Sequence, residues 1–583
     1  MRARAAHSAD PLASVAEPPR PISPSLTGGS EAGRQAHRSP QAQPTAVSAA
    51  VGHIAPAEWR WLAALGAGLG ALLAVPYAVW LLAGPAALVH IGSFWYPRDF
   101  MVYLAAMHQG AESPSWLIVD RFTPEPHAPV FMFPVYVALG KLAALLRVPL
   151  LAVYYAAEWG GRLALLAALY GFAAAFLPTV GQRRLALGLM LMGTNLGLWA
   201  ALALLALQPA AASPEALALG ASLEVTTLGV FLAPLHLMLG LACTLWAVAA
   251  YAAATTPGTG ARAWLALTAA ILGLGLVHPF NLAVVVGVLA SHAALEGVST
   301  RCWPSRAALA VAVAGAVALP FVAYNYATFR LDPFWSVVYS AQNEVPSPAP
   351  PRLLIDYGPV LWLAPLALRA WPRPWSSRQR LVLLWVALLL VALYAPVPFQ
   401  RRLAFGLQPG LAVLAAAGLA WLGLQLAPPG RRRLGIALLL AGLPTAAFLY
   451  AGMVLSAATN YPVEVYAARR DEWAAGEWLA AHMAPDEVVL ATEESGFWLA
   501  ALVPGRVFLG HKGITYDVAD KRAVVDAVLT ASPGEVARML AAHGIHYLYY
   551  GPRERARGPL AEAPGLVLVY QTPEVAIYRV AIR

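Results

Sequence analysis

Charged side chains are scarce in this sequence of 583 residues. Only 12% of the residues are Asp, Glu, Lys or Arg, whereas 59% are hydrophobic. A soluble domain is usually about a quarter charged and just under half apolar. In water such a chain would expose far too much apolar surface. The composition therefore excludes a soluble globular protein and predicts a polytopic protein whose solvent is lipid.

Cysteine is almost absent too. The two cysteines are Cys243, within an apolar run, and Cys302, in a short basic loop. Neither a disulfide framework nor a cysteine-based metal site can be built from them. The C-terminal region also has no Gly-rich phosphate loop and no metal-ligand spacing. We therefore predict no metal ligands and no definite cofactor, and the sequence leaves a divalent metal ion open.

The beginning of the sequence has no apolar stretch and is rich in Ala, Pro, Ser and Arg. Such a segment cannot bury enough surface to order itself, which predicts a disordered cytoplasmic tail over residues 1–56. A cleavable signal peptide needs an apolar region near its start. The first long apolar run, 61–84, is therefore expected to remain as a membrane span.

The net charge of +9 comes from arginines that cluster between apolar runs. This placement is typical of cytoplasmic loops and not of a phosphate-binding stripe, so nucleic acid is not an expected partner. A helix of about 20 apolar residues crosses the bilayer. That rule predicts eleven spans, near 61–84, 151–177, 185–206, 228–254, 263–277, 280–298, 307–327, 353–370, 381–396, 403–426 and 434–456.

A further apolar stretch, 130–147, is interrupted by Pro134, Lys141 and Arg147. If this stretch lies along the outer surface, most later arginine clusters fall on the cytoplasmic side. If it crosses the membrane, the same clusters point outward, which the positive-inside rule disfavours. We therefore expect a multi-pass protein of the plasma (inner) membrane with its N-terminus in the cytoplasm and its C-terminal region outside.

The expected fold is an all-α membrane domain over 57–460, with a large outer loop at 85–150, and a small extracytoplasmic α/β domain over 461–583. The outer loop is predicted to hold a short helix near 99–109 and the surface-lying helix 130–147. The C-terminal domain alternates helical and strand-like patterns. Its expected helices are 465–482, 517–530 and 533–543, and its expected strands are 487–492, 506–509, 546–550, 566–571 and 575–581.

Asp99 follows an aromatic run and precedes Phe100, Tyr103 and His108. Aromatic side chains of this kind gather at the membrane interface, so Asp99 is expected at the outer surface. One interpretation is a general base, or a carboxylate that orients an acceptor. The other is a helix N-cap, for which Asp is a common residue. The local sequence does not choose between the two.

Two neighbouring arginines, Arg401 and Arg402, break the positive-inside pattern at the outer end of a span. Guanidinium groups bind phosphates in a bidentate manner, so this pair could hold a lipid-linked phosphate. The alternative is that both side chains reach to lipid headgroups. Because charges on the unexpected side are costly, the functional interpretation is favoured.

Arg162 lies four residues after Glu158 within one predicted span, so both face the same side of the helix. An internal ion pair is the favoured explanation of this spacing. The functional alternative is that Arg162 contributes to donor-phosphate binding in the same cavity as Asp99.

Five further residues are candidates for lining such a cavity. His236 and His278 lie near outer helix ends, and Pro279 frees backbone carbonyls beside the second histidine. An isolated intramembrane histidine is more often structural than a ligand. The polar turn at 510–512 has no identifiable partner, so we expect it to be structural. The five candidates are Tyr103, Glu224, His236, His278 and Gln400.

This layout resembles that of the C-type (GT-C) membrane glycosyltransferases, which use polyprenyl-phosphate sugars, such as the mannosyl- and aminoarabinosyltransferases. The resemblance rests on "DFMVYLAAMHQG", which opens at Asp99, followed by "FTPEPHAPVFMFPVYVALGKL" before the second span. The later segments "LVHPFN" and "PFQRRLAFGLQPGLAVLAAAGL" also fit a bacterial branch of this family. Many members carry two adjacent acidic residues in the first loop, whereas here Arg98 precedes a single Asp99.

The resemblance implies that a sugar moves from a polyprenyl-phosphate lipid to a glycan, lipid or protein acceptor on the outer face. Asp99 would then be the catalytic carboxylate, and Arg401 and Arg402, with Arg162, would bind the donor phosphate. Two other classes remain as alternatives. One is a lipid or glycan transporter or flippase, for which we see no inverted repeat. The other is a non-catalytic membrane scaffold.

Overall fold

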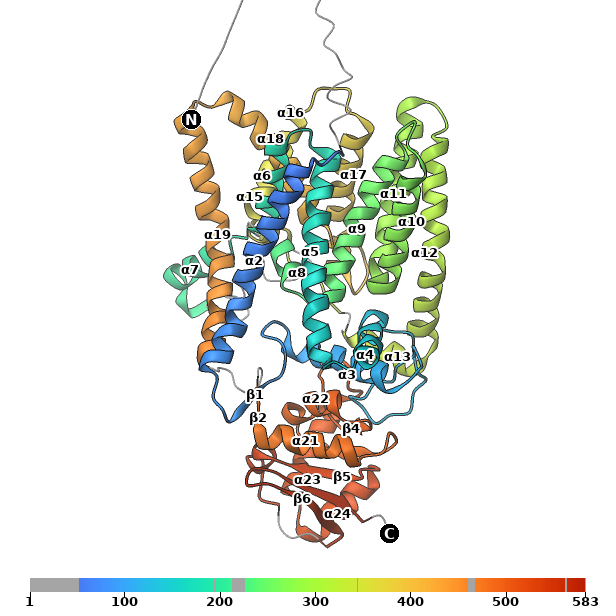
Figure 1. Ribbon diagram of the computed structural model, residues 1–583, viewed down its shortest axis with the longest axis vertical. Coiled ribbons are helices and arrows are strands. Elements are labelled where there is room, and N and C mark those ends of the chain that lie inside the picture. The colour runs from blue at the N-terminus through green and yellow to red at the C-terminus, as the bar shows by residue number, and fades with distance from the viewer. Residues whose placement is uncertain are drawn as a thin grey trace, which may run out of the picture. The chain divides into compact units, whose positions relative to one another are not determined.

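The computed structural model describes residues 52–192, 195–211, 226–342, 344–459, 467–560 and 564–581. Within these ranges a body of helices is followed by a small C-terminal region that contains a mixed sheet (Figure 1). Residues 1–51 of the predicted disordered tail lie outside the described residues, and so does the candidate Glu224.

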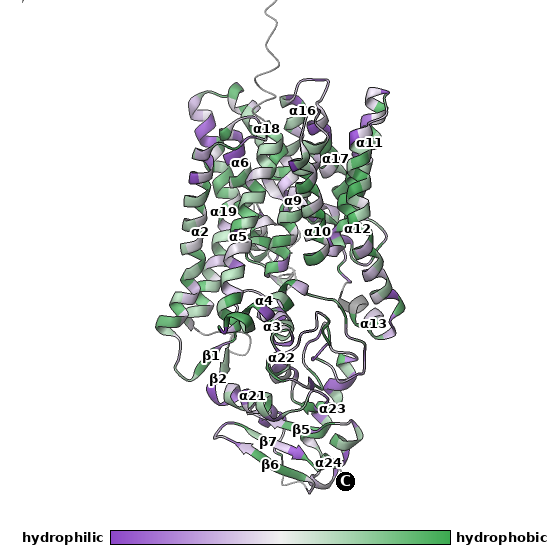
Figure 2. Ribbon diagram, turned by 45° about the vertical axis from the view of Figure 1, so that its right-hand side comes forward, coloured by the Kyte–Doolittle hydropathy of each residue, from purple (hydrophilic) through white to green (hydrophobic). Residues whose placement is uncertain are grey.

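Seven helices in the described ranges are long and apolar enough to cross a membrane. Figure 2 shows hydrophobic residues along the helical body, whereas hydrophilic residues gather at its ends and in the C-terminal region. The seven are α2 (Pro56–Ala83), α5 (Leu150–Phe176), α9 (Leu235–Ala254), η2 with α11 (Pro279–Asn281 and Leu282–Thr300), α12 (Ser305–Leu331), η4 with α18 (Gln400–Ala404 and Leu407–Gln425) and α19 (Pro428–Thr459).

The other four predicted spans are not among these seven helices. The stretch 185–206 is divided between α6 (Val180–Leu191) and α7 (Gly197–Leu207). The stretch 353–370 bends by 106° between α14 (Pro350–Asp356) and the helical segment Gly358–Ala370, and counts as an eighth span only if both parts are taken together.

The bend at this second stretch has a local cause. Gly358 has a φ of +48°, which a side chain would disfavour, and Pro359 has no amide hydrogen to continue the helix. The segment after the bend contains α15 (Gly358–Leu363), η3 (Ala364–Leu366) and α16 (Ala367–Ala370). The remaining two predicted spans are single helices of 17 and 16 residues, α10 (Ala261–Val277) and α17 (Ser377–Ala392).

Two helices lie in the segment between α2 and α5, as the sequence predicted. They are α3 (Pro97–Glu112) and α4 (Pro134–Leu146), and each begins with a proline. At 13 residues α4 is about 20 Å long, which is too short for a 30 Å hydrocarbon core. A Cβ on Gly140 would lie 1.9 Å from the Met107 carbonyl oxygen, so this glycine allows the two helices to approach closely.

The C-terminal region contains a five-stranded sheet of order β4-β3-β5-β7-β6. Strand β3 is parallel to both of its neighbours, and the pairs β5–β7 and β7–β6 are antiparallel. The strands are β3 (Val488–Leu490), β4 (Arg506–Val507), β5 (Tyr547–Tyr550), β6 (Leu566–Gln571) and β7 (Ala576–Val580), and the helices are α21 (Arg470–His482), α22 (Glu493–Leu502), α23 (Val518–Thr530), α24 (Pro533–Ala542) and α25 (Pro552–Arg555).

Two details of this region differ from the sequence prediction. The described part of the expected helix 465–482 begins as strand β2 (Ala467–Arg469), which pairs antiparallel with β1 (Leu88–His90) of the outer loop. Helix α22 was not predicted, although Glu493 and Glu494 in its first turn are typical of a helix start. Helix α22 packs against α3, so both unpredicted elements connect the C-terminal region to the loop.

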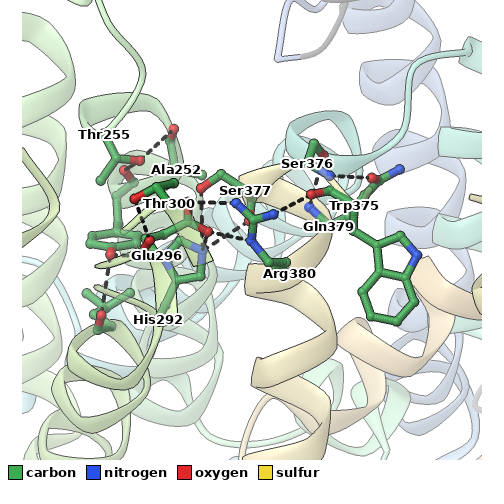
Figure 3. A network of polar contacts seen from close by, with 12 residues as sticks. Ala252, Thr255, His292, Glu296, Thr300, Trp375, Ser376, Ser377, Gln379 and Arg380 are labelled. Atoms are coloured by element: carbon green, nitrogen blue, oxygen red, sulfur yellow. Dashed lines mark hydrogen bonds and ion pairs between the residues drawn. The ribbon is translucent and has the colours of Figure 1, made fainter. Parts of the chain in front are cut away.

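A network of polar contacts, the paired network, connects α9, α11 and α17 (Figure 3). Arg380 donates two hydrogen bonds to Glu296, of 2.7 Å from Nε and 2.8 Å from Nη2. The Nε2 of His292 lies 3.3 Å from the same carboxylate and 3.0 Å from the carbonyl oxygen of Ser377. Its Nδ1 lies 3.1 Å from the hydroxyl of Tyr251. Every charged group of this network therefore has a partner.

Candidate active site

A cavity of about 380 Å³ lies where α3, α4, α9, α10, α12 and η4 meet. It brings together five of the nine residues singled out from the sequence: Asp99, Tyr103, His236, His278 and Arg402. The remaining wall is largely apolar and includes residues of α12 and of the turn after α10. Three segments far apart in the sequence, near residues 99, 236–278 and 402, thus contribute polar side chains to one space.

Asp99 is the third residue of α3 and not its N-cap. The helix begins at Pro97, and the capping position belongs to Tyr96, whose φ of 57° is left-handed. The capping interpretation of Asp99 is therefore wrong. In the first turn a carboxylate is stabilised by the positive end of the helix dipole. The Asp99 side chain is 43% exposed and lines the cavity.

Arg402 lies in η4, and its guanidinium carbon is 5.5 Å from the centre of the Phe280 ring. Its Nε is buried and has no hydrogen-bond partner in the described part of the chain. Gly406, with a φ of +93°, turns the chain from η4 into α18, and the indole of Trp385 donates to its carbonyl oxygen over 3.0 Å. These contacts hold η4 at the end of α18, beside the cavity.

The neighbours of Arg402 have other surroundings. Arg401 is not among the residues that line the cavity; its amide donates to the carbonyl oxygen of Val345, and its charge acts on Asp356. The side chain of Gln400 accepts a hydrogen bond of 3.1 Å from the amide of Ser347. The expected arginine pair is thus divided, with only Arg402 at the cavity.

Arg162 is also absent from the cavity wall. It lies 3.1 Å from Glu158, both side chains are nearly buried, and its guanidinium packs over the ring of Trp159 at 5.2 Å. This is the internal ion pair that the spacing favoured. A role for Arg162 in donor binding has no support from these contacts.

The two histidines of the cavity sit in an aromatic wall. Tyr103 stacks on Tyr136 with ring centres 4.5 Å apart, and the hydroxyl of Tyr136 lies 3.0 Å from Nδ1 of His236. The ring of His278 packs at 4.7 Å from Phe405. A Cβ on Gly240 would lie 2.7 Å from that of His278, so α9 needs a glycine there to accommodate the histidine.

The C-terminal region reaches the same place through His511. This imidazole is nearly buried, and its Nε2 lies 3.5 Å from Oδ1 of Asp99. The 510–512 turn was expected to be structural because its sequence identifies no partner. No local sequence signal could have identified Asp99 as the partner, because the contact joins the beginning of α3 to a turn near the end of the chain.

A second set of contacts, the loop clasp, fixes the outer loop to the C-terminal region. Lys521 donates to Glu125 over 2.7 Å and to Thr123 over 2.9 Å, and burial lowers the pKa of this lysine. Arg506 donates to the carbonyl oxygen of Pro124 over 3.0 Å. Burial raises the pKa of neighbouring Asp120 to about 7. The loop clasp therefore places buried charged groups between two parts of the chain.

In the ranges that the structure describes, no group of three or more His, Cys, Asp or Glu side chains could hold a metal ion. The polar groups at the cavity are one carboxylate, one guanidinium, two imidazoles, the hydroxyls of two tyrosines and the amide of Asn325. Such a set can take up a proton and stabilise an anion.

Comparison with known proteins gives a structural likeness only. No protein-family model matches the sequence, and no curated protein matches it. The archaeal oligosaccharyltransferase AglB from Archaeoglobus fulgidus, in complex with an inhibitory peptide and a dolichol-phosphate, has a TM-score of 0.50 and 12% identity, and the match covers 87% of this chain and 74% of AglB. ArnT from Cupriavidus metallidurans, bound to undecaprenyl phosphate, has a TM-score of 0.44 and 12% identity, with 88% and 98% covered. The chain is thus structurally similar to GT-C glycosyltransferases, which confirms at the level of the fold the resemblance inferred from its sequence.

Proposed function

We propose that this chain is a membrane glycosyltransferase that moves a sugar from a polyprenyl-phosphate lipid to an acceptor on the extracytoplasmic face. One observation carries the proposal: the carboxylate of Asp99 and the guanidinium of Arg402, with its buried and unpartnered Nε, line the same cavity. The structural likeness to AglB, which is described in complex with a dolichol-phosphate, supports it.

Arg402 suits the phosphate of the donor. A guanidinium keeps its charge when it is partly desolvated, and its planar donors match phosphate oxygens. A buried Nε without a partner is costly in the empty cavity, and a bound phosphate oxygen would remove that cost. The aromatic and aliphatic wall would accept the sugar face and the start of the isoprenoid chain.

The lipid can reach this cavity from the bilayer. Leu276 and Tyr324 both line the cavity and are each 38% exposed. In the most apolar part of helix α12, which supplies Tyr324, only 22% of the residues are buried, so most of this helix is available to lipid. An isoprenoid chain could lie along this helix while its headgroup occupies the cavity.

The reaction is a displacement at the anomeric carbon of the sugar. The acceptor's O–H or N–H loses its proton to Asp99 as its heteroatom forms the new bond to that carbon. The bond between the anomeric carbon and the phosphate oxygen breaks, and its electron pair leaves with the phosphate. Arg402 stabilises the charge that develops there. The acceptor can be a glycan, a lipid or a protein, and the bilayer presents the donor.

The charge distribution supports the extracytoplasmic side. The arginine clusters at 183–184, 301–306, 369–380 and 431–433 lie at or near helix ends away from the cavity, as expected for the cytoplasmic side. The cavity and the C-terminal region then face outward, where a lipid-linked sugar is used in place of a soluble nucleotide sugar.

The test uses cells of the source organism, so that the natural donor and acceptor are both present. With Asp99→Asn the donor lipid is expected to accumulate, because an amide cannot take the acceptor's proton; transfer should fall by about 10²–10⁴-fold. Mass spectrometry of polyprenyl-phosphate lipids measures the accumulation. The melting temperature of the purified variant should stay native, since Asp99 is neither a cap nor buried. Unchanged lipid pools with Asp99→Asn would refute the proposed function.

A further inference from the structure

The contact between the C-terminal region and the cavity has a specific geometry at His511. The imidazole Nδ1 accepts a hydrogen bond of 3.1 Å from the amide of Gly513. In the neutral ring the proton must therefore be on Nε2, which is the nitrogen that faces Asp99 at 3.5 Å. The turn itself thus selects the tautomer that presents an N–H to the carboxylate.

The surrounding contacts fix the imidazole in place. The amide of His511 donates to the hydroxyl of Thr515 over 3.0 Å, and that hydroxyl donates to the carbonyl oxygen of Phe122 over 2.7 Å. The Phe122 ring lies edge-on to the imidazole at 6.1 Å. With a side chain that is only 6% exposed, His511 has little freedom to turn away from Asp99.

We propose that His511 is a positioning residue for Asp99, supplied by the C-terminal region, and that the site is complete only when this region is attached to the outer loop. The inference rests on the proposed function. The Nε2–H faces Oδ1 and orients the carboxylate, which leaves Oδ2 free to take the proton of the acceptor. His511 gains and loses no proton in this step, so the balance of the reaction is unchanged.

The C-terminal region is connected to α3 at more than one point, which makes this coupling physically direct. Arg98, the residue before Asp99, lies 3.1 Å from Glu493 of α22, and its guanidinium packs over the ring of Phe497 at 5.6 Å. The beginning of α3 is therefore held on one side by Arg98 and on the other by His511. A displacement of the C-terminal region would move both contacts and release the Asp99 carboxylate.

Two substitutions at His511 separate positioning of Asp99 from stabilisation of the turn. In His511→Asn the amide oxygen occupies the place of Nδ1, so the bond from Gly513 is kept and the donor to Asp99 is lost. In His511→Gln the amide nitrogen reaches the place of Nε2, so the donor is kept and the turn bond is lost. The two variants have similar size and polarity, and each serves as the control of the other.

We expect His511→Asn to lower transfer about 10- to 100-fold, a usual cost of losing a group that orients a reactive one. His511→Gln should keep transfer near that of the wild type. In the Asp99→Asn background, His511→Asn should cause no further loss. Donor-lipid accumulation in cells measures transfer, and binding of undecaprenyl phosphate to the purified full chain should be the same in both variants.

The proposal is supported only if transfer is lost in His511→Asn and retained in His511→Gln. Loss of transfer in His511→Gln, or wild-type transfer in His511→Asn, would overturn it and leave His511 as a residue of the turn. Failure of the proposed function looks different: Asp99→Asn would then leave the lipid pools unchanged, and the role of His511 would fall with it.

Discussion

The two ends of helix α9 show how the same kinds of side chain can have opposite surroundings. Near one end, Tyr251 belongs to the paired network, in which Arg380 and His292 share the carboxylate of Glu296. In the first turn at the other end, 15 residues away or about 22 Å, His236 lines the cavity with Arg402. The Nε of Arg402 is buried and has no partner within the described ranges.

This difference separates structural charges from charges kept for a ligand. In a bidentate pair of Arg and carboxylate, each group satisfies the hydrogen bonds of the other, and the pair stabilises the fold. A buried donor without a partner lowers stability, and where such a group also lines a cavity, as Arg402 does, another molecule can supply the missing acceptor. The paired charges therefore stabilise the fold at one end of α9, whereas the unpaired donor at the other end is available to a ligand.

The strongest test of this comparison is Arg402→Gln. Removal of one charge-assisted contact should weaken undecaprenyl phosphate binding by about 10- to 100-fold, since such bonds contribute about 1.5–3 kcal/mol. The melting temperature should hardly change, because the Nε has no partner in the chain to lose. Titration of the purified chain with undecaprenyl phosphate measures both effects.

The adjacent arginine provides the matched comparison for that measurement. Arg401→Gln removes the same charge one residue away, but Arg401 does not line the cavity. Its effect on undecaprenyl phosphate binding should be small. Equal loss in the two variants would mean that headgroup attraction, and not the cavity, holds the lipid.

The same substitution at the other end should have the opposite effect. Arg380→Gln breaks the bidentate pair with Glu296, whose side chain is only 13% exposed and would keep only the contacts with His292 and Ser377. We expect a loss of about 2 kcal/mol in the free energy of unfolding. Undecaprenyl phosphate binding by the folded fraction should be unchanged. A variant with native thermal stability would contradict the structural role of the paired network.

The sequence predicted individual helices and strands better than it predicted contacts between distant segments. Runs of about 20 apolar residues located α2, α5, α12 and α19 within a few residues, because hydropathy directly reflects the thickness of the bilayer. The same rule treated 353–370 as one span and so missed the 106° bend, although Gly358 and Pro359 are a local turn signal in the sequence. Strand propensity likewise located β5, β6 and β7, whereas pairing of β1 with β2 depends on contacts between distant segments.

The sequence identified single candidate residues of the site, but it did not show which of them face the same cavity. The unusual placement of Asp99 and of the 401–402 pair is visible in the sequence. Which arginine faces the cavity depends on how η4 turns, and α18 and Gly406 determine that turn in three dimensions. The ion pair of Arg162 and Glu158 followed from helical spacing alone, which is why that interpretation needed no tertiary information.

Arg98 tests an intermediate case between the two ends, and the smallest effect is expected there. Its pair with Glu493 is 35% exposed on the arginine side, and exposed pairs contribute about 1 kcal/mol or less. In addition, Glu493 keeps Arg522, whose Nε lies 2.7 Å away, so Arg98→Gln leaves no carboxylate unpaired. The loss in the free energy of unfolding should therefore be at most about 1 kcal/mol and should shrink at high salt. By contrast, Arg98→Glu places a second carboxylate beside that of Glu493 and should loosen the C-terminal region, with more rapid proteolysis near residue 467 and lower transfer. If Arg98→Gln destabilised the chain as much as Arg380→Gln, the solvent exposure of an ion pair would not determine its contribution to the free energy of unfolding in this protein. The contrast between paired and unpaired charges at the two ends of α9 would then lose its basis.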